Sequence, residues 1–128
     1  MIRCLVEGNS INATTRMTGV AKNTVLKPLV EIGSGCSAFL DETMRNLSCA
    51  RLQADEAWSF CYCKQRNLTP EIAEKTVAGD VWVWVALDAD TKLISCWLLG
   101  KRGAGCATDF IQDLAGRLAN RIQLTTDG

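Results

Sequence analysis

The sequence predicts an α+β chain in which an all-helical N-terminal part precedes a mixed α/β part. Three observations predict this class. Residues 1–35 hold short segments of helical periodicity separated by glycines. Residues 80–100 hold two runs rich in valine, tryptophan and leucine around a polar turn, and residues 108–128 hold an amphipathic helical pattern followed by a short strand pattern. The domain organisation we infer is a helical module (1–35), a connector (36–50) and an α/β domain (51–128).

Composition restricts the classes of protein to which the chain can belong. Its 128 residues suit one ordinary domain or two small ones, and 48% hydrophobic with 22% charged residues is typical of globular proteins. No apolar run approaches the roughly 18 residues that span a bilayer, and the N-terminus does not resemble a secretion signal. We therefore expect a soluble, cytoplasmic protein with no membrane partner.

The cysteine and histidine content and the distribution of charge restrict the kinds of functional site that the chain can contain. The seven cysteines form no CxxC pair and histidine is absent, which argues against a zinc finger and against an imidazole base. The net charge is zero, but residues 1–33 carry a slight basic excess and the remainder a slight acidic excess. Such a distribution suits a DNA-binding module attached to another domain.

The helical module has the layout of a helix-turn-helix. Residues 2–7 are predicted to form a short helix that ends at Gly8. Ser10 can cap a second helix, from Ile11 to Thr18. A turn that contains glycine then leads into a third helix, from Lys22 to Ile32, which Gly33 ends. In this layout the last helix enters the major groove. The alternative is an ordinary three-helix cap with a polar surface. The candidate DNA contacts are Arg16, Lys22, Asn23, Thr24 and Lys27.

Pro28 conflicts with a regular recognition helix. It lies past the first turn, where proline lacks the backbone donor and clashes with the carbonyl of Thr24, at a cost of about 3 kcal/mol. We expect a helix kinked at this point and DNA binding that is weak and sensitive to salt.

The run from Leu52 to Tyr62 reads as a β-strand that contains two adjacent acids, Asp55 and Glu56. Successive side chains of a strand point to opposite faces, so only one of these acids can face a given site. A carboxylate in the middle of a strand is costly unless it binds a cation or remains solvated. Both readings, a cation ligand and a solvated edge strand, are open from this run alone.

The remaining elements follow in a regular order. Residues 65–79 form a polar excursion with a helical turn starting at Thr69 and Pro70, and strands at 80–88 and 93–100 form a hairpin. In the helix at 108–120 we expect Phe110, Ile111, Leu114 and Leu118 to face inward. We expect Trp82, Trp84 and Trp97 to lie in the core, and Asp88 and Asp90 to form the hairpin turn.

Strand, hairpin, helix and strand, with one aspartate on the first strand and another at the end of the last, match the first half of the ribonuclease-H-like fold. In that fold the two strands lie side by side and their acids converge. Two converging carboxylates need a cation, and divalent ions held by them orient phosphate and activate a nucleophile. This pattern therefore favours the interpretation of Asp55 as a ligand of a divalent cation over that of a solvated edge-strand acid.

Six segments of the sequence resemble one family: VEGNSI (6–11), TGVAKNTV (18–25), LQADEAWSFCY (52–62), GDVW (79–82), LDADTKL (87–93) and QLTTDG (123–128). The likeness is to bacterial insertion-element transposases of the insertion-sequence-one group and runs through essentially the whole chain. It implies a cytoplasmic bacterial protein that binds the DNA ends of its element. It also implies DDE-type strand cleavage and transfer with Mg²⁺ or Mn²⁺, with Asp55 and Asp127 as the first and second catalytic acids and as ligands of the metal.

The sequence also departs from the family pattern. The family's third acid, a glutamate on a later helix, has no counterpart, and Pro28 interrupts the recognition helix. We therefore expect a truncated transposase that does not cleave or join DNA by itself. The alternatives are a non-enzymatic helix-turn-helix DNA-binding protein and an inactive relict. We further expect the uncovered apolar face and free edge of the sheet to drive self-association into a homo-oligomer.

Overall fold

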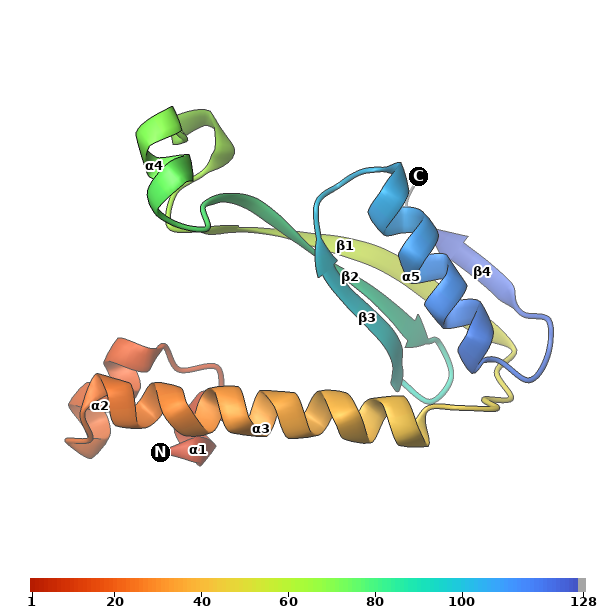
Figure 1. The fold of residues 1–128 in the computed structure, drawn as a ribbon. Coiled ribbons are helices and arrows are strands. Elements are labelled where there is room, and N and C mark those ends of the chain that lie inside the picture. Colours follow the sequence, from red (N-terminus) through yellow and green to blue (C-terminus); the bar gives the residue numbers. More distant parts are fainter. Residues whose placement is uncertain (127–128) are drawn as a thin grey trace. The chain divides into compact units, whose positions relative to one another are not determined.

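The computed structural model describes residues 1–126, which form two compact units (Figure 1). The first unit covers residues 1–43 and the second begins at Met44. The chain is an α+β protein, as predicted, and each unit has its own set of elements.

The first unit consists of α1 (Ile2–Val6), α2 (Ile11–Thr18) and α3 (Lys22–Thr43). The predicted cap of α2 is confirmed, because the Ser10 hydroxyl accepts a hydrogen bond of 3.1 Å from the backbone N–H of Ala13. Gly19 ends α2 with a φ of +70°, a left-handed conformation that glycine adopts without the penalty of a Cβ atom. Thr14 and Val25 are fully buried in this unit.

The third helix is longer than the sequence predicted. It continues through Gly33 and Gly35 to Thr43, so the predicted end at Gly33 is wrong. Neither glycine has a positive φ, and a glycine inside a helix costs only about 1 kcal/mol relative to alanine. The helix also continues on both sides of Pro28. Although α3 has 22 residues, no helix within residues 1–126 combines the length and apolar character needed to cross a membrane.

The second unit is a four-stranded mixed sheet with one long helix and a small helical excursion. Its strands lie in the order β3-β2-β1-β4, with β1 antiparallel to β2, β2 antiparallel to β3, and β1 parallel to β4. The elements are β1 (Arg51–Cys61), η1 (Gln65–Asn67), α4 (Pro70–Lys75), β2 (Gly79–Asp88), β3 (Ile94–Gly100), α5 (Ala104–Arg117) and β4 (Gln123–Thr126). The predicted hairpin and the helical turn capped by Thr69 are confirmed.

One face of the sheet packs against α5 and forms the core (Figure 1). The ring of Phe110 lies 5.9 Å from that of Trp84, and Leu114 is also buried. Ile111, which we expected to face inward, is 42% exposed. The inward stripe runs through Phe110, Leu114 and Arg117, and Ile111 lies about 100° around the helix from Phe110.

No helix among the described residues of this unit covers the opposite face of the sheet. Alternation along β3 places Cys96 in the core and Trp97 on the uncovered face, where Trp97 pairs with Val85 of β2 and remains 43% exposed. The prediction that all three hairpin tryptophans lie in the core is therefore wrong for Trp97. Trp84 is a core residue and Trp82 is partly buried against the core.

Candidate functional site

Asp55 lies in the middle of β1 on the uncovered face of the sheet. Its partner across β2 is Val85, and Gln53 and Ala57 share its face, as strand alternation predicted. The side chain is exposed, and its Oδ1 accepts a 2.7 Å hydrogen bond from the backbone N–H of Glu56. It opens into a hollow of about 600 Å³ lined by Gln53, Ala54, Asp55, Ala57, Val83, Val85, Leu87, Ile94, Thr125 and Thr126.

This hollow offers a cation one carboxylate and several neutral oxygens. Asp55 is the one charged residue among the described residues that line it. Gln53 and Thr125 are register partners across β1 and β4, so their side-chain oxygens join the same lining. Carboxylate, amide and hydroxyl oxygens are the ligand types that Mg²⁺ and Mn²⁺ accept. The chemistry of the donor set therefore fits a hard divalent ion, with one strong ligand supplied by the described residues.

Asp127, the second predicted ligand, lies outside the described residues. The strand before it is described: β4 runs parallel to β1, and Thr126 is the partner of Ala54. Within residues 1–126 there is no cluster of three or more cysteine, aspartate or glutamate side chains placed to hold a metal ion. The convergence of Asp55 and Asp127 stays a prediction.

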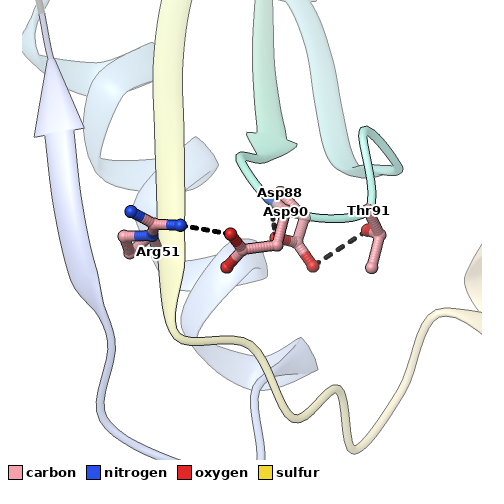
Figure 2. Close-up of polar contacts among 4 residues, drawn as sticks. All are labelled: Arg51, Asp88, Asp90 and Thr91. Carbon is pink, nitrogen blue, oxygen red and sulfur yellow. Dashed lines mark hydrogen bonds and ion pairs between the residues drawn. The ribbon is translucent and has the colours of Figure 1, made fainter.

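The aspartates of the hairpin have a different role from Asp55 (Figure 2). Asp88 accepts hydrogen bonds of 2.9 Å from the backbone N–H of Asp90 and from the hydroxyl of Thr91, while Asp90 forms an ion pair with Arg51. The hydrogen bond from the Asp90 backbone, followed by that from Thr91, holds the pKa of Asp88 below its usual value. These contacts fix the β2–β3 turn, in agreement with the turn-forming role that the sequence predicted.

A second polar cluster lies between the sheet and α5. Asp113 Oδ2 accepts hydrogen bonds of 3.0 Å from Arg117 Nε and from the Cys96 thiol. Burial, and next the hydrogen bond to Asp113, raise the pKa of Cys96 to about 12. Burial alone would raise the pKa of Asp113 as well, but the hydrogen bonds from Arg117 and Cys96 outweigh it and leave that pKa below its usual value. Cys96 is therefore a thiol at neutral pH, unsuited to act as a nucleophile.

The predicted DNA contacts lie mostly at one end of α3. Lys22, Asn23 and Thr24 occupy its first turn and are exposed, and Lys27 follows one turn later. Lys27 Nζ is 3.9 Å from Glu31 Oε1, a solvent-exposed pair that competes only weakly with a phosphate. Arg16 is exposed in the last turn of α2. The structure thus gathers four of the five candidates on the first two turns of one helix.

Two exposed aromatic side chains on the other face of β1 were given no role in the predictions from the sequence. Trp58 and Phe60 are 43% and 44% exposed although they share a face with the buried Leu52. The signal was present as alternation of large aromatic residues in β1, followed by basic residues at positions 64 and 66. It could not be used without knowing where α5 stops covering the sheet.

Comparison of the chain with protein-family models, with curated proteins and with solved structures finds no match. The proposals below therefore depend on the residues and geometry of this chain.

Proposed function

We propose that the chain joins a DNA-binding helix-turn-helix to a ribonuclease-H-like unit of the kind that, in the insertion-element transposases it resembles, cleaves and transfers DNA strands with divalent metal. The observation that carries the proposal is the position of Asp55. It is an exposed carboxylate on the uncovered face of a central strand, next to the parallel strand β4. The strand order and directions support it, since β1, β2 and β3 are antiparallel neighbours and β4 lies beside β1 after a helix.

The first unit supports the DNA-binding half of the proposal. A capped helix, a left-handed glycine and a second helix follow one another, and the second helix begins with exposed Lys22, Asn23 and Thr24. Residues at the N-terminal end of a recognition helix contact base edges, and lysines pair with phosphates. The DNA ends of an insertion element are the proposed target.

In the proposed reaction, Asp55 and Asp127 would be ligands of Mg²⁺ or Mn²⁺, together with the family's third acid, which has no counterpart in this sequence. Such a bound ion activates water or a 3′-hydroxyl for attack on phosphate. Within the described residues, Asp55 contributes charge and position: its backbone pairs with Val85 of β2, and the preceding residue, Ala54, pairs with Thr126 of β4. The apolar neighbours Val83 and Val85 limit the water around it.

Manganese-induced broadening of backbone NMR signals tests the metal site directly. We expect Mn²⁺ to broaden the signals of residues 53–57 and 124–126 in the wild type, and the Asp55→Asn variant to lose this effect. The matched control is Glu56→Gln, which removes the adjacent acid on the opposite face and should leave the broadening intact. If both variants lose the broadening equally, Mn²⁺ is attracted by the combined negative charge of Asp55 and Glu56 and is not bound at a specific site.

Fluorescence anisotropy with duplex DNA tests the binding half separately. The double variant Lys22→Ala, Lys27→Ala should weaken binding and reduce the slope of log affinity against log salt by about 0.9 for each phosphate that is no longer neutralised. The control is Lys75→Ala, at the end of α4 in the other unit. Duplex binding combined with no effect of Asp55→Asn on Mn²⁺ would favour the alternative function, a non-enzymatic DNA-binding protein.

The proposal includes association of two copies through the uncovered apolar face of the sheet. Ile94 and Leu99 of β3 are 44% and 60% exposed there, at a free edge of the sheet. A second copy is the occupant we propose, since a formal net charge of zero gives copies no long-range repulsion. Sedimentation velocity should show a dimer that dissociates when Leu99 is replaced by Asp, and a wild type that stays monomeric at high concentration would contradict it.

A further inference from the structure

The strands β1 and β2 continue beyond the part of the sheet that α5 covers. Register pairs of β2 with β3 stop at Trp82 and Gly100, and the pairs of β1 with β4 reach Ala54 within residues 1–126. Residues 58–61 and 79–82 therefore form a two-stranded ribbon that leads to η1 and α4 (Figure 1). On this ribbon Trp82 is partly buried against the core, whereas Trp58 and Phe60 remain exposed.

The face of the ribbon that continues the core carries three aromatic rings. Trp58 and Phe60 alternate along β1, so they share a face, and their ring centroids are 5.8 Å apart. Trp82 is the direct register partner of Trp58 on β2. We call these three residues the aromatic strip. Trp58 and Phe60 each leave more than two fifths of their surface in solvent, which is unusual for rings of this size.

Cationic side chains lie over the aromatic strip. Lys64 Nζ is 5.0 Å from the centroid of the Trp58 ring, and Arg102 Cζ is 5.0 Å from that of Trp82. Arg66 joins Trp58, Lys64 and Asp80 around a hollow of about 230 Å³. Among the described residues, Lys64, Arg66 and Arg102 have no ion-pair partner. The nearby carboxylate of Asp80 accepts a 2.8 Å hydrogen bond at its Oδ1 from the backbone N–H of Gln65 instead.

We propose that the aromatic strip and its cations bind single-stranded nucleic acid. Every base has a π face that stacks on an indole or phenyl ring, and phosphates pair with lysine and arginine, so aromatic rings beside cations suit an unpaired strand. A duplex hides its base faces and could use only the charges. A partner protein or a lipid surface would also cover the rings, but neither requires cations placed on the ring faces of both indoles.

This site is separate from those of the proposed function. Asp55 lies on the opposite face of β1 from Trp58, and the residues proposed to contact duplex DNA belong to the first unit. The inference would therefore stand if the helix-turn-helix or the metal site failed its own test.

The test is titration of the full chain with fluorescein-labelled oligo-dT and oligo-U of 12 nucleotides, followed by anisotropy and by quenching of tryptophan fluorescence. Removing a stacking ring weakens binding by roughly five- to hundredfold, so we expect that loss for Trp58→Ala and for Phe60→Ala. The matched control is Phe39→Ala, which removes an exposed phenylalanine from α3 and should leave affinity unchanged. Trp58→Phe keeps a ring and should retain most of the affinity.

Charge and ligand identity are tested in parallel. The double variant Lys64→Ala, Arg102→Ala should lower the salt slope by about 0.7 for each phosphate that is no longer neutralised. Equal affinity for oligo-dT and oligo-U supports recognition through bases and phosphates alone, and a preference for one identifies DNA or RNA as the ligand. Unchanged affinity in Trp58→Ala and Phe60→Ala, no quenching on titration, or binding only to phosphatidylserine vesicles would overturn the proposal.

Discussion

Replacing Phe110 with alanine tests the packing on which every site of the second unit depends. Phe110 is 2% exposed and contacts Trp84 on the helix-covered face of the sheet. Phenylalanine-to-alanine changes in cores cost about 3–5 kcal/mol, through lost burial and the cavity that remains. Because small domains have only about 5–15 kcal/mol of stability, this change should remove a large part of it.

The matched control for this prediction is the neighbouring residue. Ile111 is 42% exposed, so Ile111→Ala should change the free energy of unfolding by less than about 1 kcal/mol. Urea unfolding followed by tryptophan fluorescence measures both variants. At an m value of about 2 kcal/mol/M, Phe110→Ala should lower the urea midpoint by about 1.5–2.5 M and Ile111→Ala by less than about 0.5 M. Equal losses would show that α5 buries a different stripe from the one described.

Three further predictions concern titration, reactivity and the long helix. Hydrogen bonds hold the pKa of Asp88 below its usual value, so the stability they contribute is present above about pH 4 and is lost as the pH falls through the lowered pKa. Urea unfolding of the wild type and of Asp88→Asn measures this contribution. The difference in free energy of unfolding between the two proteins should shrink below about pH 4. Cys96, with a pKa of about 12 and no exposed surface, should resist iodoacetamide at pH 8 in the folded chain, whereas exposed Cys36 reacts, as mass spectrometry would show. Pro28→Leu restores the donor that the Thr24 carbonyl lacks and should increase both helicity by circular dichroism and affinity for duplex DNA; no change in either would refute the reasoning about Pro28.

The sequence predicted elements best where a local signal marks their ends. The serine cap and left-handed glycine gave α2 its correct bounds, Ile11–Thr18, because both signals act within one turn. Gly33 misled the prediction of α3 since glycine can end a helix or simply sit inside one. The choice depends on whether the backbone turns left-handed, which the residue type permits but does not require.

Burial was harder to predict than secondary structure. The sequence predicted that Trp82, Trp84 and Trp97 lie on the two strands of the hairpin. It did not predict which face of the sheet each ring occupies or where the covering helix ends. Helix α5 begins at Ala104, earlier than the predicted start at 108, and covers only part of the sheet. Trp97 is exposed because it lies on the face of the sheet opposite to α5. Trp58 is exposed because it lies on the ribbon beyond the end of α5.

The two faces of β1 explain how one strand can carry two unrelated candidate sites. Leu52 is fully buried against α5, and alternation from it places Ala54, Trp58 and Phe60 on the helix side and Asp55 on the other. A slip of one residue would turn Asp55 toward the core, where an unpaired carboxylate costs several kcal/mol, and would expose Leu52. The requirements of the core thus fix the register, and the register alone decides that the carboxylate faces the hollow while the aromatic strip faces solvent beyond the helix.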